Sequence, residues 1–340
     1  MLTKEQKQIA GQIWKEIEKA EKILLHCHPN PDPDSVGSAL AMMFALQRLG
    51  KQVTVIAGDS ELPQTMAHLS GFDQIVPKNY FEIKPEEFDL FLILDSSKKN
   101  HISQKGEVFF PSSMRTVVID HHMQDEFYGQ INLVDSNYPA VAQMLFDLFE
   151  EWQIAISNEI AVCLMLGLYA DTGGFKYPRT TTESFLMAAR LAEVNPDFPG
   201  VIFDYENNNE PEKIRFLGLA LSSIKLYFNG RIALSEVTSQ VLQEQGIEYQ
   251  HTRQTEISNY LKSVKDWEIG VSLIGKRADE VVVNFRTRDY QRYDVSKIAN
   301  ILGGGGHPAA AGATIKKPIG EAKEFLLATI QQVFPELGKP

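Results

Sequence analysis

Two mainly apolar runs, residues 88–94 and 116–119, each end at an aspartate, Asp95 and Asp120. Such runs are typical of strands buried on both faces of a parallel sheet. Residues 23–27 and 52–57 resemble two more strands. Helical spacing covers residues 4–22, 35–49, 139–151, 158–169 and 181–194. The alternation predicts an α/β fold with a mainly parallel sheet flanked by helices.

The chain has 340 residues, which exceeds the usual size of a single core and predicts two domains. Asn, Pro, Asp and Glu dominate between residues 195 and 212, and a helix is expected over residues 211–227. Beyond it, strand-like segments at 232–237, 271–274, 281–286 and 309–315 alternate with helical patterns at 256–264, 295–302 and 319–334. We therefore expect a first domain over residues 1–195, a linker with a connecting helix over 196–228, and a smaller α/β domain over 229–340.

The net charge of -11 disfavours a long nucleic-acid track, which requires a basic stripe. No run of about 18 apolar residues predicts a membrane helix, and the charged amphipathic residues 1–20 do not resemble a secretory signal. The two cysteines stand in apolar contexts, which favours buried thiols in a reducing cytosol over one disulfide. We expect a cytoplasmic enzyme with no membrane partner and no stable long nucleic-acid partner.

Acidic or imidazole residues stand at the ends of apolar strands or helices in four segments. In open α/β sheets, ligands gather beyond the carboxyl ends of the strands, so these segments could converge on one crevice. The oxygen and nitrogen donors, without cysteine, suit Mn²⁺, Mg²⁺, Co²⁺ or Zn²⁺. Six donors are about right for two ions roughly 3.5–4 Å apart. The candidate ligands are His28, Asp32, Asp34, Asp95, His121 and Asp171.

Each of these features has a plainer interpretation when taken alone. A strand-terminal aspartate is more often a turn or helix cap, and the Asp32-x-Asp34 spacing lacks the glycine and glutamate of an EF-hand. Cys27 is interpreted as a core residue, and His26 as a packed or hydrogen-bonded one. Three further histidines have no acidic cluster in sequence and are interpreted as surface residues: His68, His101 and His251.

The second half contains a glycine run, Gly303, Gly304, Gly305 and Gly306, followed by His307. The run is too rich in glycine for the middle of a strand or helix, and its N–H groups could approach an anion closely. No Gly-Lys-Ser/Thr follows, so it is not a Walker A loop. Arg286 could add a planar fork for phosphate. The alternative is a flexible turn beside an exposed histidine and arginine.

Together these motifs resemble the DHH phosphoesterase superfamily. The matching segments are residues 28–38, Asp95, the Asp120-His121-His122 triplet, and Asp171 with the Thr-Gly-Gly that follows it. Phe285-Arg286 and the glycine run with His307 resemble its DHHA1 domain. The resemblance runs over nearly the whole chain in the right order. It is strongest to the bacterial type that acts as oligoribonuclease and phosphoadenosine-phosphate phosphatase, which shares a core with the exonuclease RecJ.

The resemblance implies a role for each residue. His28, Asp32 and Asp95 would bind one ion. Asp34, Asp95, His121 and Asp171 would bind the other, so that Asp95 bridges. His122 would face the substrate phosphate and Asp120 would orient His121, which makes Asp95, His122 and Asp120 the catalytic group. The substrate would be held by Arg286, Gly304, Gly305, Gly306 and His307. The sequence departs from the family pattern at Pro33, where glycine is usual, and at Lys176, where arginine is common.

The function implied is a two-metal phosphoesterase, with Mn²⁺ preferred and Mg²⁺ or Co²⁺ as alternatives. Its substrates would be short oligonucleotides (nanoRNA), 3′-phosphoadenosine 5′-phosphate (pAp), or both. Hydrolysis of cyclic di-AMP or linear di-adenylate is the alternative. A RecJ-like single-strand exonuclease, a pyrophosphatase and a non-catalytic nucleotide sensor rank lower. The oligomeric state, including a homodimer, stays open.

Overall fold

The structure is a computed structural model that describes residues 1–96, 98–122, 127–252 and 257–339. Glu256, the first residue of one predicted helix, lies outside the described residues. The chain forms two compact units, Met1–Asn208 and Asn209–Pro340, and the division lies within the predicted linker. Within the described residues, none of the helices has the length and apolar character needed to cross a membrane.

The first unit is built on a five-stranded sheet in which all neighbouring strands are parallel. Its order is β2 (Gln52–Ile56), β1 (Lys22–His26), β3 (Leu90–Leu94), β4 (Arg115–Asp120) and β5 (Ile131–Val134). Every residue of β3 is buried, as expected for a central strand covered on both faces. The predicted α/β class is confirmed, although β5 was not foreseen.

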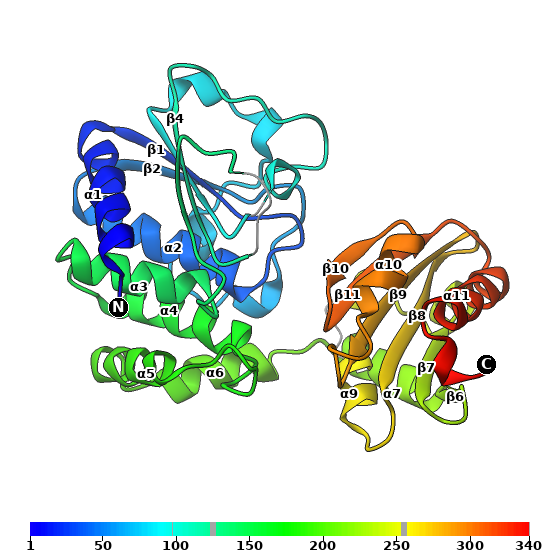
Figure 1. The fold of residues 1–340 in the computed structure, drawn as a ribbon. Coiled ribbons are helices and arrows are strands. Elements are labelled where there is room, and N and C mark those ends of the chain that lie inside the picture. The colour runs from blue at the N-terminus through cyan, green and yellow to red at the C-terminus, as the bar shows by residue number, and fades with distance from the viewer. Residues whose placement is uncertain (97, 123–126, 253–256, 340) are drawn as a thin grey trace. The chain divides into compact units, whose positions relative to one another are not determined.

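Helices cover one face of this sheet (Figure 1). Those that pack on the sheet are α1 (Lys4–Lys19), α2 (Pro33–Arg48) and α3 (Val141–Glu151). Helix α4 (Asn158–Asp171) packs on α2 and α3, and helices α5 (Thr182–Val194) and α6 (Phe198–Asn207) pack on α4. Alternate strand residues such as Leu24 and Phe91 point to the other face, where they pack on side chains of the segments after β2 and after β3. The segment after β2 contains short 3-10 turns at Gln64–Met66, Phe72–Gln74, Tyr80–Glu82 and Pro85–Glu87, and the segment after β3 contains one at Lys99–His101.

Two glycines let α2, α3 and α4 approach closely. A Cβ placed at Gly37 in α2 would lie 2.5 Å from the carbonyl oxygen of Cys163 in α4. A Cβ at Gly167 in α4 would lie 2.8 Å from Oδ1 of Asp34 and 2.9 Å from the Cβ of Ala142. Only a residue without a side chain fits at either place, so these glycines fix how near α4 lies to the start of α2.

The second unit is a smaller α/β layer structure around a six-stranded mixed sheet. The sheet order is β10 (Gly305–His307), β11 (Ala310–Ile315), β9 (Glu280–Thr287), β8 (Ile269–Arg277), β7 (Ile232–Val237) and β6 (Lys225–Tyr227). The β7–β8 pair is parallel, and the other pairs are antiparallel. One face packs on α10 (Val295–Ile301) and α11 (Ile319–Val333). The other packs on α7 (Pro211–Ser222), α8 (Ser239–Glu244) and α9 (Ile257–Ser263). Short 3-10 turns follow α8 at Tyr249–Thr252 and α11 at Pro335–Leu337.

Three local expectations were wrong. The helix predicted over residues 211–227 ends at Ser222, and β6 takes its last three residues. The glycine run was judged too rich in glycine for the middle of a strand, but Gly305–His307 forms a short strand. This strand lies at the edge of the sheet and forms backbone hydrogen bonds with β11 alone. Residues 198–207, expected to be linker, form helix α6.

Candidate metal centre

The loop after β1 delivers the first group of candidate ligands. Asp32 is the N-cap of α2, and its Oδ1 accepts a hydrogen bond from the Ser35 N–H at 2.9 Å. Pro33 stands in the first turn, where proline is favoured because its missing N–H is not needed there. The Nδ1–H of His28 donates to the Pro29 carbonyl at 3.0 Å. That bond leaves Nε2 of His28 available to a metal ion.

Asp95 lies at the centre of the site. It directly follows β3, is only 2 % exposed, and has a φ of 53°, in the left-handed region that residues other than glycine rarely adopt. Its Oδ2 lies 3.3 Å from Nε2 of His28. Its Oδ1 lies 3.5 Å from Nε2 of His121 and 3.4 Å from Nδ1 of His122. The strained backbone thus turns one carboxylate toward three imidazoles.

Asp34, in the first turn of α2, is fully buried against the start of α3. Its carboxylate accepts hydrogen bonds from the N–H groups of Val141 at 2.6 Å and Ala142 at 2.9 Å. The Ser38 hydroxyl donates to Oδ1 at 3.2 Å. The amino end of a helix favours a negative charge, so α3 helps to hold Asp34 in place.

The last group of candidate ligands comes from the ends of β4 and α4. Nε2 of His121 lies 3.3 Å from Oδ2 of Asp171. The Nδ1–H of His121 donates to the Tyr138 carbonyl at 3.3 Å, which again leaves Nε2 for a metal ion. The expectation that Asp120 orients His121 was wrong. Asp120 Oδ1 accepts instead from the backbone N–H of His122 at 3.0 Å and from its Nδ1–H at 2.8 Å.

The structure brings all six candidate ligands together in overlapping groups whose donor atoms lie within 4.8 Å of one another. Two unpartnered atoms show that this cluster fits cations. Asp95 Oδ1 and His121 Nε2 are buried and have no hydrogen-bond partner among the described residues. Buried polar atoms without partners are rare, and a bound ion would satisfy both. The groups are His28, Asp32 and Asp95; Asp34, His121 and Asp171; and Asp95, Asp120, His121 and His122.

The carboxylates are too crowded to be ionised together without added positive charge. Burial, followed by the charge of Asp95, raises the pKa of Asp34 to about 7. Burial and the charge of Asp34 raise the pKa of Asp171 well above its ordinary value. Burial alone would raise the pKa of Asp95, but the nearby imidazoles of His121 and His28 outweigh burial and hold that pKa well below its usual range. Two divalent cations would stabilise the ionised form of the whole set.

The burial of two further histidines near the cluster was predicted with different success. His26 is buried as expected, with Nε2 3.4 Å from the Ser96 hydroxyl, and burial lowers its pKa to about 3. His101 was expected at the surface, which is wrong. It is partly buried, and burial and the charges of His28 and His122 lower its pKa. Its signal was its place in the turn that follows Asp95.

His68 is exposed, as its sequence context predicted. His251 is not a plain surface residue, because its Nδ1 lies 2.6 Å from Oε2 of Glu210 and its side chain is 15 % exposed.

In the second unit, strand register places Arg286 and His307 on the same face of the sheet, with β11 between them. Both pair with Ala310, one from β9 and the other from β10, so their side chains stand on the same face of three adjacent strands. Gly304 and Gly306 have a packing reason as well. A Cβ at Gly304 would lie 2.1 Å from the Gly312 carbonyl oxygen, and Gly306 has a φ of 133°. Gly305 is open, with the nearest atom 3.9 Å from its Cβ position.

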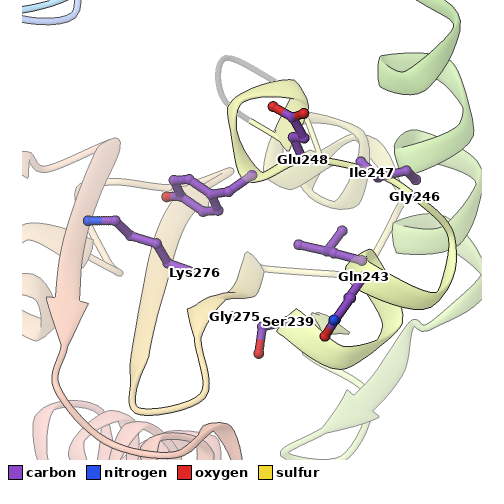
Figure 2. A pocket seen from close by; sticks show the side chains of 9 residues that line it. Ser239, Gln243, Gly246, Ile247, Glu248, Gly275 and Lys276 are labelled. Carbon is purple, nitrogen blue, oxygen red and sulfur yellow. The ribbon is translucent and has the colours of Figure 1, made fainter.

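A separate cavity of about 420 Å³ lies elsewhere in the second unit (Figure 2). Its wall includes Ser239, Gln243, Tyr249 and Lys276. Neither the arginine nor the histidine just described lines it, so it is distinct from the predicted phosphate-binding residues.

Two family profiles match the chain. The profile described as "DHH family, N-terminal domain" matches residues 22–168, and the profile described as "DHHA1 domain" matches residues 237–336. The first match spans the parallel sheet and five of the six candidate metal ligands. The sixth, Asp171, lies three residues beyond the end of the match. The second contains Arg286 and the glycine run.

Characterised relatives align over almost the entire chain. It is 27% identical to the "Bifunctional oligoribonuclease and PAP phosphatase NrnA" of Thermus thermophilus, over 98% of this chain and 96% of the relative. It is 26% identical to the "Probable bifunctional oligoribonuclease and PAP phosphatase NrnA" of Streptococcus mutans, over 96% of each. A crystal structure of an exopolyphosphatase-related protein from Bacteroides fragilis has the same fold, with a TM-score of 0.88, 22% identity and 98% coverage of both chains.

Proposed function

Because the chain belongs to the DHH/DHHA1 superfamily, with both domains in the expected order, we propose that it hydrolyses short oligoribonucleotides and pAp. The observation that carries the proposal is the buried ligand cluster, in which Asp95 Oδ1 and His121 Nε2 lack partners. The full-length relatives named as oligoribonuclease and PAP phosphatase support the choice of substrate.

The clustering of donor atoms supports the proposed assignment of the metal ligands. His28, Asp32 and Asp95 would hold one ion, and Asp34, Asp95, His121 and Asp171 the other. We propose Mn²⁺ as the preferred ion, because mixed carboxylate and imidazole donors suit it. A pair of such ions supplies Lewis acidity at phosphoryl oxygens and lowers the pKa of a bound water.

The protein's own side chains complete the site. Asp120 fixes the ring of His122 through two hydrogen bonds and, against the effect of burial, raises its pKa to about 9. A protonated imidazole is a suitable donor to a phosphate oxygen, and we assign this contact to His122. In the second unit, Arg286, His307 and the open Gly305 would bind the nucleotide and its phosphates.

The proposed location is the cytoplasm. Both cysteines are free and buried, so the alternative of one disulfide is wrong, and free thiols are usual in a reducing compartment.

A substrate panel tests the function. The purified protein with Mn²⁺ would be assayed on pAp, short RNA, short DNA, linear di-adenylate, cyclic di-AMP and pyrophosphate, and ranked by kcat/KM. Short RNA and pAp are expected to lead. A higher kcat/KM for cyclic di-AMP or pyrophosphate would replace the proposed substrate class, and no hydrolysis of any of them would refute a phosphoesterase.

A further inference from the structure

The segment that follows α4 brings an arginine to the rim of the metal centre. The NH1 group of Arg179 donates to the carbonyl oxygen of His121 at 3.3 Å. Its positive charge also acts on the carboxylate of Asp171. The guanidinium therefore lies beside two of the proposed ligands, although it comes from a loop to which no role has been given.

This arginine is oriented without being neutralised. Its side chain is exposed, and its hydrogen-bond acceptor is an uncharged carbonyl. Within the part of the chain that the structure describes, Arg179 makes no ion pair. An arginine that serves only stability usually pairs with a carboxylate. Here the side chain is exposed and uses one N–H group on a neutral carbonyl, so the guanidinium has further donors to offer a ligand.

The loop is built to hold that position. A tight turn with left-handed backbone follows α4. Its residues Gly173, Gly174 and Phe175 have φ values of 58°, 65° and 64°. The Thr172 hydroxyl donates to the Leu168 carbonyl at 2.7 Å and accepts from the Phe175 N–H at 3.0 Å. A second turn follows, in which the Thr180 N–H donates to the Tyr177 carbonyl at 3.0 Å, and Arg179 lies within it. The two turns order the backbone that carries the arginine before any ligand arrives.

The charge at the centre calls for such a group. Five aspartates carry five negative charges, and two divalent ions together with a protonated His122 would carry five positive ones, so the charges of the loaded centre would balance. A phosphate monoester then adds roughly two negative charges. An anionic substrate therefore gains from a cation at the rim that is not already paired. The five are Asp32, Asp34, Asp95, Asp120 and Asp171.

We propose that Arg179 is a substrate-binding residue of the first unit, which holds a non-bridging oxygen of the substrate phosphate. The inference rests on the proposed function for the identity of the substrate, but the phosphate contact can be measured without it. The fork of a guanidinium suits phosphate oxygens, and a lysine would provide charge without that geometry.

The test compares Arg179→Gln and Arg179→Lys with a matched control, Arg190→Gln. Arg190 is an exposed arginine of α5 that pairs with Glu150, so its removal changes the net charge equally. For each protein, Mn²⁺ affinity, binding of inorganic phosphate to the Mn²⁺-loaded form, and KM and kcat on pAp would be measured.

Arg179→Gln is expected to weaken phosphate binding and kcat/KM by about 10–100-fold, as for a lost charged hydrogen bond. Mn²⁺ affinity should stay unchanged, the lysine variant should recover part of the loss, and the control should stay near wild type. Unchanged phosphate binding in Arg179→Gln would overturn the inference. So would a parallel loss of Mn²⁺, since the arginine would then only support His121. If the wild type binds phosphate but hydrolyses neither pAp nor short RNA, the proposed function fails, and phosphate binding alone decides the role of the arginine.

Discussion

Replacement of Gly37 by alanine adds one methyl group where α2 lies against the backbone of α4. The new Cβ would lie 2.5 Å from the carbonyl oxygen of Cys163 and 3.3 Å from its carbonyl carbon. These atoms belong to a helix backbone and cannot rotate away, so the two helices must separate. Overpacking of this kind costs about 1–3 kcal/mol. The better helix propensity of alanine returns at most about 1 kcal/mol.

Because the contact is with backbone atoms, the upper part of that range, about 2–3 kcal/mol, applies, and the net loss for Gly37→Ala is about 1–2 kcal/mol. In a unit that spans Met1–Asn208, each kcal/mol shifts the Tm by about 2–4 °C, so the transition of this unit should fall by about 2–8 °C. Because α2 also carries Asp32 and Asp34 at its start, Mn²⁺ affinity should fall in the same variant.

Gly11→Ala is the matched control, because Gly11 lies in α1 and no atom lies within 4 Å of its Cβ position. This substitution should raise the stability by up to about 1 kcal/mol through propensity alone. Differential scanning calorimetry of the metal-free proteins, with the transitions of the two units fitted separately, measures both shifts. The reasoning about close helix packing is refuted if Gly37→Ala melts at or above the wild type, or if both alanines shift the Tm in the same direction.

Four further outcomes are expected. Asp95→Ala should lose bound metal and nearly all turnover, measured by metal analysis and pAp hydrolysis; near-normal hydrolysis would exclude a bridging role. His307→Ala should keep its metal but raise KM or lower kcat, and a loss of metal in this variant would contradict its assignment to substrate. In the metal-free protein, burial raises the pKa of Asp34 to about 7 and that of Asp171 well above normal, so protons compete with the ions as pH falls. Mn²⁺ affinity in calorimetric titrations should thus fall roughly tenfold between about pH 8 and about pH 6, and an affinity independent of pH would argue against these carboxylates as ligands. Burial raises the pKa of the Cys27 thiol to about 12, so a thiol reagent should label it only after denaturation, and fast labelling of the native protein would show that the site is open.

The position of the candidate site could be predicted from sequence because it depends on a simple rule of parallel sheets. Strands that run in the same direction end at the same edge, so residues that follow β1, β3 and β4 meet there whatever their separation in sequence. His28, Asp95 and His121 each follow one of these strands. Helix α4 adds Asp171 at its last residue, which the hydrophobic pattern also indicated.

Short or half-exposed elements were harder to predict, since their burial pattern is weak. In the edge strand β5, only Leu133 is buried, so no alternation of apolar residues marks it. Helix α6 did carry a signal. Its first turn contains Pro199, which is favoured at that place in a helix, but the polar composition around it suggested a linker.

Side-chain pairing at the site lay beyond sequence reasoning. Whether Asp120 bonds to His121 or to His122 depends on the backbone path where β4 ends, which hydrophobic periodicity does not determine. Likewise, the left-handed conformation of Asp95 and the partial burial of His101 follow from how the loop after β3 closes. Only the folded backbone could reveal these details.

The order of the proposed ligands along the chain bears on how the protein is made. The residues of the first ion set, His28, Asp32 and Asp95, leave the ribosome well before Asp171, which the second set requires. A nascent chain that stops before α4 lacks both that carboxylate and the helix against which Asp34 is buried. Under the proposed ligand assignment, loading with two ions would wait for synthesis of α4, and a product truncated before that helix would lack the second ion.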